Sequence, residues 1–512
     1  MGEAFPLFAT IVQACGRLYI RPMALGRREK IAVVGAGAAG LGAAWMLSQK
    51  HDVTIYEAGE ALGGHAFAHP FPGSDKFVDM GVMITLPWAY PNLYCMFQRY
   101  GVRTSAAGAT LLVSFPTEDG TARESWGTDS SLRQSDLFLR MEDQASRFEL
   151  MMFEVAALPL AMQTKPISYF LNGAVPGVPH SGGYGEEFVA KGLCPLLSLF
   201  LVTRDSLLDT PAWSLSMMFR YGTISFFSPT TWRTIDGGTR DYISRLTRSF
   251  QARQFLGTKV TSVVRGNQGV TVRDDKGNSD RYDQVVIATD AKTALEILES
   301  PSADEKRLLG TFRYEPAVAY LHQDPRVLGG DDPGVFFHYR SENPTPGPTL
   351  DGVMTYDMKR AAGLDKPSPD SPVPGPVLVS VLSKEVEVPF EGVVKEQKFF
   401  HMIPDEKAVN ARLALHKIQG KERVWFCGDY TTFASHEDAF VSGVVIGEAL
   451  GASYVFREHA AAFERYRQNR MLMLRFGTGT RLGLLARGEL LSDLVGAVAG
   501  QAWIRWNELF PD

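Results

Sequence analysis

The sequence lacks the features of several common classes of protein. Its 512 residues include four scattered cysteines, Cys15, Cys95, Cys194 and Cys427, whose spacing fits no metal site. We therefore expect reduced thiols and no bound metal, which favours the cytoplasm, although a mitochondrial or membrane-peripheral location stays open. No apolar run reaches about 18 residues, so we expect no membrane-spanning helix. A net charge of −5 gives no indication of a nucleic-acid partner.

What the sequence does contain is a glycine-rich segment that directly follows a short apolar run. Residues 31–34 read Ile-Ala-Val-Val and predict a strand, and residues 41–50 predict a helix. Between them lies the pattern Gly-x-Gly-x-x-Gly, which comprises Gly35, Ala36, Gly37, Ala38, Ala39 and Gly40. In a strand–turn–helix unit such a pattern is typical of a dinucleotide site.

Each glycine of this pattern has a physical role in that interpretation. Gly35 permits the tight turn, Gly37 lets the backbone approach a pyrophosphate, and Gly40 lets the helix pack closely on the strand. The positive end of the helix then faces the phosphates.

A second predicted strand, residues 53–56, supports the same interpretation. It ends in Glu57, which lies 20 residues after Gly37, where an acidic group meets a ribose hydroxyl. The sequence therefore predicts dinucleotide binding. The alternative is a glycine-rich turn in an ordinary βαβ unit.

A second glycine pair follows the acidic residue. After Glu57 and Ala58 the chain continues to Gly63, Gly64 and His65. This spacing is similar to the extended motif of FAD-binding flavoproteins, in which the pair brings backbone amides near the pyrophosphate and the ribityl chain. The alternative is a plain turn.

A distant segment resembles the closing motif of one flavoprotein superfamily. Residues 423–430 predict a buried strand that ends in Gly428-Asp429, and residues 436–443 open an apolar helix that reaches about Leu450. This arrangement resembles the amine oxidase and phytoene desaturase superfamily, in which Gly-Asp contacts pyrophosphate and ribityl groups. There the helix N-terminus points at the flavin ring and can stabilise negative charge on it.

The middle of the chain supplies a third part of the resemblance. A predicted helix follows Asp236-Gly-Gly, and strands are predicted from residue 257, at 269–272 and at 284–288. In the superfamily the residue similar to Val260 holds the adenine through its backbone, and the segment similar to Ala288-Thr289 returns the chain to the cofactor.

The resemblance implies an α/β fold and an FAD cofactor. The implied architecture is a Rossmann-like FAD-binding domain of the glutathione reductase type, with an inserted mixed α+β substrate domain and a C-terminal helical segment. The residues expected to bind FAD are Gly35, Gly37, Ala38, Ala39, Gly40, Glu57, Ala58, Gly63, Gly64, His65, Gly81, Val82, Met83, Val260, Thr289, Gly428, Asp429, Glu437, Asp438 and Ala439.

Finer similarities divide between two branches of the superfamily. The stretch Gly63-Gly-His-Ala resembles a branch described as FAD-binding proteins of bacteria and fungi, and this likeness spans roughly residues 30 to 452. A weaker likeness, around Asp79-Met-Gly-Val-Met, is to polyunsaturated fatty acid double-bond isomerases.

The cofactor domain is expected to be discontinuous. We assign residues 29–90, 232–298 and 418–452 to it, and residues 91–231 and 299–417 to a substrate domain. The first insertion is largely helical by its pattern, over 137–161, 186–203 and 211–221, and the second contains strands near 317–322 and 377–382.

The two ends of the chain are set apart from this scheme. Residues 1–28 form an N-terminal extension that contains arginines, and it is equally consistent with a presequence, an untargeted extension or a lid. Residues 453–512 are expected to form a C-terminal helical segment that packs on the body or on a partner chain. Contact with a membrane face is the minority interpretation, and the oligomeric state stays open.

No nicotinamide site is found beyond the flavin loop, which narrows the chemistry. We expect an FAD-dependent oxidoreductase or a redox-neutral isomerase that uses hydride transfer at flavin N5 on carbon–carbon bonds. The small substrate would be hydrophobic and lipid-like, such as an unsaturated fatty acid or a polyene. The alternatives are an amine or amino-acid oxidase that produces hydrogen peroxide, and a non-enzymatic, FAD-dependent chaperone or lipid-binding protein.

Candidate substrate-pocket residues come from apolar segments expected to reach the flavin. Met83, Phe219 and Phe227 are candidates for the pocket wall, with a plain core role as the alternative. Arg220 and Arg233 are candidate carboxylate anchors, since guanidinium binds carboxylate with two hydrogen bonds. A structural role is the alternative for both arginines.

Candidate catalytic residues are His65, His436 and Tyr430. His65 takes the place of an arginine that usually follows the glycine pair, and its imidazole can titrate near the ring. Amine oxidases of the superfamily pair two aromatic residues at the flavin face. Ser435 occupies one of these places here, with Tyr430 as the only candidate partner, which disfavours amine oxidation.

Overall fold

The glycine-rich segment forms the centre of a parallel sheet. In a computed structural model, which describes residues 27–107, 110–201, 207–220, 222–227, 232–328, 335–347, 352–364, 373–382, 390–432 and 435–474, strand β1 (Lys30–Val34) is buried from Ile31 onward. Burial on both faces explains why this strand reads as a continuous apolar run. The expected extension 1–28 lies outside the described residues up to residue 26, as does the expected C-terminal segment beyond residue 474.

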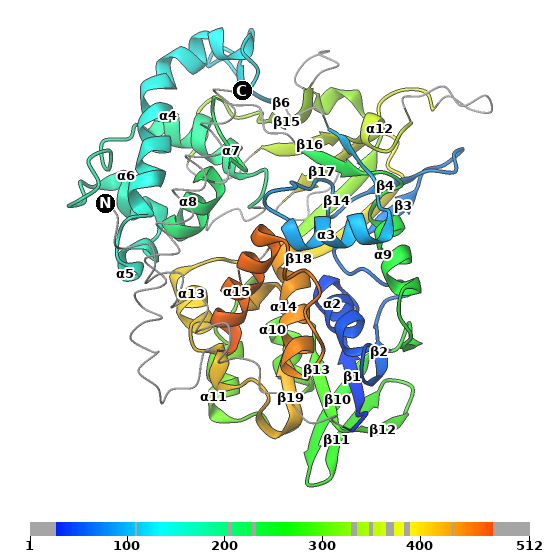
Figure 1. Ribbon diagram of the computed structural model, residues 1–512. Helices are drawn as coiled ribbons and strands as arrows, with labels where there is room; N and C mark the ends of the chain where they lie inside the picture. Colours follow the sequence, from blue (N-terminus) through cyan, green and yellow to red (C-terminus); the bar gives the residue numbers. More distant parts are fainter. Residues whose placement is uncertain are drawn as a thin grey trace.

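Helix α2 (Ala38–Leu47) follows the turn and packs against α14 (His436–Ala449). Both helices are apolar around most of their circumference, which is typical of helices enclosed in a protein core. Gly443 permits their close approach, because a Cβ atom there would lie within 2.6 Å of the backbone nitrogen of Ala43. The first and last thirds of the chain are thus packed directly together (Figure 1).

The parallel sheet takes its strands from three distant parts of the sequence. Its order is β19 (Val424–Phe426), β13 (Gln284–Ile287), β1, β2 (Asp52–Tyr56) and β9 (Arg253–Phe255). Strand β1 has β2 on one side and β13 on the other. The chain therefore reverses its direction of travel across the sheet beside β1, and such a switch point opens a crevice at the carboxyl ends of the strands.

A second, seven-stranded sheet lies above the first in Figure 1. Its order is β18 (Lys395–Met402), β14 (Tyr314–His322), β17 (Leu378–Leu382), β16 (Val353–Asp357), β15 (Val335–Arg340), β6 (Thr110–Pro116) and β7 (Arg123–Gly127). The strands expected near 317–322 and 377–382 are confirmed. Strands β6 and β7 correct the expectation of a largely helical first insertion, because the apolar run 111–115 pairs with β15 and is buried.

The rest of the first insertion forms a helical cluster beside this sheet (Figure 1). It consists of α4 (Asp136–Val155), α5 (Leu160–Gln163), α6 (Ile167–Asn172), a π-helical turn (Phe188–Leu193), α7 (Cys194–Leu197) and α8 (Ala212–Arg220). The helices expected at 137–161 and 186–203 are therefore shorter or interrupted. Their inner faces join the second sheet in one core rich in Phe, Met and Leu.

The remaining strands and α-helices are shorter or lie outside the two large sheets. They are β3 (Ala68–Pro70), β4 (Phe77–Asp79), α3 (Pro91–Tyr100), β5 (Thr104–Ala106), β8 (Arg233–Ile235), α9 (Thr239–Arg248), β10 (Val260–Gly266), β11 (Gly269–Asp274), β12 (Ser279–Tyr282), α10 (Ala291–Ile297), α11 (Ala303–Leu309), α12 (Met358–Ala361), α13 (Glu406–Arg412) and α15 (Ala460–Leu474). No helix in the described ranges is both long and apolar enough to cross a membrane.

Asp79 joins two of these elements at the edge of the cofactor region. Its buried carboxylate, at the end of β4, accepts hydrogen bonds from the backbone N–H (2.9 Å) and the hydroxyl (2.6 Å) of Thr239, the first residue of α9. Burial raises the pKa of Asp79 to about 6, although the bonds from Thr239 act in the opposite direction. The carboxyl is therefore easier to protonate in the folded protein than in the unfolded chain.

This difference predicts a pH-dependent contribution to stability. The protonated carboxyl of Asp79 makes its full contribution to stability below about pH 4. This contribution is lost as the pH rises through 6 and the buried carboxyl ionises. We expect the advantage of the wild type over Asp79→Asn in free energy of unfolding to shrink by about 2 kcal/mol between pH 4 and pH 7. Urea unfolding of both proteins across this range measures the change, and a constant difference would contradict the assignment.

Candidate functional site

A large cavity opens at the carboxyl end of β1, at the switch point of the parallel sheet. Its volume is about 1260 Å³, and its walls come from residues 34–39, 56–58, 63–65, 80–84, 88–91, 258–260, 288–290, 428–429, 435–436 and 438–439, together with parts of α10, the second sheet and α15. Ligand pockets usually enclose about 300–1,000 Å³, so this cavity has room for an extended cofactor and a second ligand.

The start of α2 lines one part of the cavity. Gly37 is the N-cap residue and offers no side-chain hydrogen bond to the helix, and the next residues, Ala38 and Ala39, line the cavity. The first N–H groups of a helix have no partner within the helix. They point their donors and the positive end of the helix dipole at this space, which suits a phosphate group.

Glu57 is held rigidly beside the start of α2. One carboxylate oxygen accepts from the N–H of Ala36 and the other from the N–H of Gly59, each at 2.8 Å. The carboxylate sits at the end of β2, next to β1, and both Glu57 and Ala58 line the cavity. An acidic group fixed at this place can accept hydrogen bonds from a ribose.

The glycine pair lies against the first glycine loop. The N–H of Gly63 donates to the carbonyl of Ala36 at 2.9 Å, and a Cβ atom on Gly64 would lie 3.0 Å from the Cα of Gly37. Gly63 and Gly64 have φ values of +127° and +58°, which glycine adopts readily. The two loops therefore form one continuous backbone wall, and His65 follows directly at the cavity surface.

The distant C-terminal motif closes the opposite wall. Gly428 and Asp429 line the cavity after β19, and the N–H of Gly428 donates to the Ser442 hydroxyl at 3.0 Å. Burial raises the pKa of Asp429, while the charges of His65 and Arg412 act to lower it. The wall continues through the start of α14, where Asp438 and Ala439 line the cavity.

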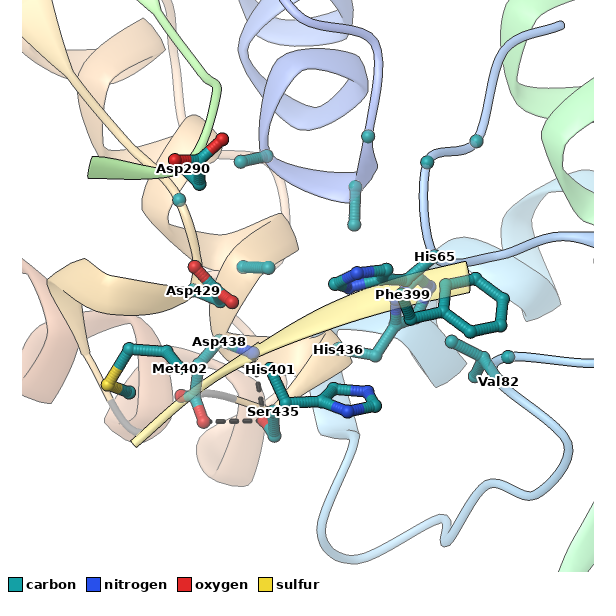
Figure 2. A pocket seen from close by; sticks show the side chains of 18 of the residues that line it. His65, Val82, Asp290, Phe399, His401, Met402, Asp429, Ser435, His436 and Asp438 are labelled. Carbon is teal, nitrogen blue, oxygen red and sulfur yellow. Dashed lines mark hydrogen bonds between the residues drawn. The ribbon is translucent and has the colours of Figure 1, made fainter. Parts of the chain in front are cut away.

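Three histidines gather in the inner part of the cavity (Figure 2). They come from the loop after the glycine pair (His65), from β18 (His401) and from the start of α14 (His436). The His65 and His401 rings lie 5.4 Å apart. Burial lowers the pKa of His65, and it lowers the pKa of His401 to about 3 and that of His436 to about 4. The latter two imidazoles are therefore neutral at pH 7.

Where the helical cluster, part of the second sheet and the segment 83–88 supply the wall, the cavity lining is apolar, and we call this part of the cavity the apolar arm. We define this arm by its lining residues Met83, Ile84, Trp88, Leu199, Phe200, Leu201, Ser214, Met217, Met218, Thr223, Tyr356, Val381 and Phe399. None of these side chains carries a charge. Methionines are common among them, and their flexible thioethers adapt to irregular ligands.

Most residues predicted to bind the cofactor line this cavity. They are Gly35, Gly37, Ala38, Ala39, Glu57, Ala58, Gly63, Gly64, His65, Gly81, Val82, Met83, Val260, Thr289, Gly428, Asp429, Asp438 and Ala439. Gly40 is not in the lining and instead lies against the carbonyl of Gly35, in keeping with its expected packing role. Of the candidate catalytic residues, His65 and His436 line the cavity and Tyr430 does not.

The structure places Tyr430 and Glu437 elsewhere than the sequence suggested. Tyr430 is fully buried and packs on Phe312, with ring centroids 5.1 Å apart. Glu437 turns away from the cavity toward the start of α3, where its carboxylate accepts from the N–H groups of Asn92 and Leu93. Glu437 therefore caps a neighbouring helix, and Ser435 caps its own.

Four of the five candidate substrate-pocket residues also lie away from the cavity lining. Phe219 packs on Phe148 and Phe227 on Phe138, so both belong to the helical core. Arg233 donates to the hydroxyl of Thr104, and Arg220, at the end of α8, does not reach the lining either. Among these candidates Met83 alone lines the arm, so the carboxylate-anchor role expected for the two arginines has no support.

Several residues in the lining were not predicted. They include Tyr90, Asp290, His401, Arg465 and Gln468. Alternation along β18 does not single out His401, because Lys398, Phe399, Phe400, His401 and Met402 all line the cavity. Nothing in the local sequence predicts that Arg465 and Gln468 of α15 line the cavity. The position of α15 depends on contacts with a distant segment, such as the ion pair between Arg465 and Asp438 at 2.9 Å.

Comparison with known proteins identifies the family. The sequence pattern of the flavin containing amine oxidoreductases matches residues 38–137 and 180–397. The chain belongs to this family. It is therefore an FAD-dependent enzyme, and the expectation of FAD and of the wider superfamily is confirmed.

Individual relatives are more distant. A segment of 78 residues is 42% identical to tryptophan 2-monooxygenase of Agrobacterium vitis, and it spans 15% of this chain and only 10% of that protein. A putrescine oxidase structure aligns with a TM-score of 0.57 and 15% identity, over 83% of this chain and 99% of that one. A CLA-producing fatty acid isomerase from P. acnes aligns at 0.52 and 16%, over 84% and 100%. At these identities the two structures show a shared fold.

The residues present fit FAD. The open N–H groups of α2, the anchored Glu57 and the close glycine walls provide the donors, the acceptor and the narrow space that a dinucleotide needs. The described residues contain no cluster able to hold a metal ion.

Replacing Glu57 by Gln tests the ribose contact. We expect FAD affinity to fall by about tenfold to a hundredfold, because an amide loses one strong acceptor and leaves a backbone N–H of the loop less well satisfied. Titration of the apoprotein with FAD, followed by flavin fluorescence, measures the affinity. The exposed neighbour Glu60→Gln is the matched control, and equal affinities for the two variants would contradict the assignment.

Proposed function

We propose that this enzyme acts on a hydrophobic, lipid-like substrate, as an oxidoreductase or double-bond isomerase of carbon–carbon bonds. The observation that carries the proposal is the uncharged apolar arm next to the inner histidines. Bound FAD supplies hydride transfer. The arm would hold an extended chain with one bond beside the cofactor and exclude water from it.

The distribution of charge around the cavity supports an apolar substrate. All lining carboxylates come from the cofactor side or α15, namely Glu57, Asp290, Asp429, Asp438 and Glu464. Among the described residues, those of 80–89 and of 199–223 that line the cavity are all uncharged. An ammonium group in the arm would therefore lose its hydration without gaining an opposite charge.

Oxidation of an amine or amino acid is the second candidate. The family match favours it, since the family is named for amine oxidoreduction. Ser435, however, lines the cavity where amine oxidases of the superfamily carry an aromatic residue, and its hydroxyl is bonded to Asp438. Tyr430, its candidate aromatic partner, is buried outside the lining.

Anaerobic mixing of the FAD-loaded enzyme with two chains of equal length separates these functions. We expect an 18-carbon polyunsaturated fatty acid to bleach the flavin or to change its own diene absorbance, and octadecylamine to do neither. Reduction by dithionite is the control for a competent flavin. Rapid bleaching by the amine, with hydrogen peroxide on re-aeration and no response to the fatty acid, would refute the proposal.

A further inference from the structure

For two of the three inner histidines, the surroundings show which ring nitrogen bears the hydrogen. The proposed function makes no use of this property. His401 reaches the cavity from β18 and His436 from the start of α14. Each neutral imidazole has one N–H donor and one bare acceptor nitrogen, and the surroundings decide which nitrogen carries the hydrogen.

The tautomer of His436 follows from Tyr242. The Tyr242 hydroxyl lies 2.7 Å from Nε2 of His436, and Tyr242 is 1% exposed. Burial raises the pKa of Tyr242, so the hydroxyl keeps its hydrogen. No other hydrogen bond is found for this hydroxyl in the described part of the chain, so it donates to Nε2. The hydrogen of His436 is then on Nδ1.

The tautomer of His401 follows from burial. Its Nδ1 is enclosed and has no hydrogen-bond partner among the described residues. Nδ1 stays without a partner in either tautomer, but buried N–H groups without a partner are rarer in proteins than buried acceptors without one. A bare nitrogen at Nδ1 is therefore the favoured choice. The hydrogen of His401 is then on Nε2, which is not among the enclosed atoms.

We propose that His401 and His436 present two uncharged N–H donors to the cavity, and that they select a ligand group that accepts hydrogen bonds over one that only donates them. The fitting chemistry is a carbonyl or carboxyl oxygen, or an acceptor atom on the edge of the flavin. An ammonium group offers donors alone and is mismatched. The proposal rests on the proposed function, since it names the head group that would accompany an apolar chain.

The surroundings of the two imidazoles agree with this assignment. A charge on His65 would act against protonation of His401 and of His436. Asp429 and Asp290 act on His65 from the opposite wall (Figure 2). Uncharged donors avoid the cost of burying a cation and still bind an oxygen atom, as in sites that stabilise developing negative charge.

Equilibrium binding to the FAD-loaded enzyme tests the proposal without turnover. The probes are dodecanoate, 2-dodecanone and dodecylamine at pH 7, which share a chain and differ in the head group. Perturbation of the flavin absorbance reports binding. We expect the wild type to bind both oxygen ligands at least tenfold more tightly than dodecylamine.

Variants assign the effect to the two donors. His401→Leu and His436→Leu should each weaken the oxygen ligands by about tenfold and leave dodecylamine unchanged. His401→Gln and His436→Asn, which keep an N–H donor near the same place, should restore most of the binding. His69→Leu, which removes a histidine of β3 outside the cavity lining, is the matched control and should leave the binding of all three probes unchanged. Tyr242→Phe should act in the same direction as His436→Leu, because Tyr242 fixes the tautomer.

The absorbance of the FAD-loaded enzyme without any probe shows whether the acceptor is the flavin edge or the head group of a bound ligand. If the flavin edge is the acceptor, the leucine variants shift the flavin absorbance before any probe is added, and the glutamine and asparagine variants do not. Equal binding of all three probes by the wild type, with no spectral shift in any variant, overturns the proposal. A failure of fatty-acid turnover with the head-group preference intact would instead refute only the proposed function.

Discussion

The open N-terminus of α2 is the constraint on which the rest of this site depends. The helix begins at Gly37 without a side-chain cap, so its first N–H groups need an external acceptor. Three neighbouring residues leave these N–H groups accessible while the surrounding backbone segments stay close together. Glu57 is fixed by the same loop, Gly64 leaves space beside Gly37, and Gly443 lets α14 pack against α2. A dinucleotide phosphate bound there would satisfy the helix end, at the junction between distant parts of the chain.

The same junction separates charge from apolar surface. Carboxylates and the α2 dipole surround the cofactor end, whereas the apolar arm is uncharged. His401 and His436 mark the boundary between the two regions, and burial keeps both neutral. This gradient gives a physical reason for a substrate that is apolar along its length and carries hydrogen-bond acceptors at one end.

Much of the cofactor region could be predicted because its signals are local. The glycine loop, Glu57 and the Gly63-Gly64 pair each lie in short segments whose backbone conformation restricts the residue type, as the φ values of the glycine pair show. The strand order then brings these segments to one edge. Glu437 could not be predicted in the same way, because its partners, Asn92 and Leu93, lie some 345 residues away in sequence.

The substrate region was less predictable for a related reason. Phe219, Phe227 and Arg233 have the composition expected of a pocket wall, but the same composition suits a core, and packing against Phe148, Phe138 and Thr104 decides between the two. Strand β6 was missed because it pairs in parallel with β15, more than 200 residues later. Such contacts leave no periodic trace in either segment.

A crystal structure of the FAD-loaded enzyme tests the central claim most directly. The account predicts the pyrophosphate at the start of α2, the ribose at Glu57 and the isoalloxazine beside His65 and His436, with the apolar arm open beyond it. A flavin ring that occupied the arm itself, or a pyrophosphate bound away from α2, would contradict the account.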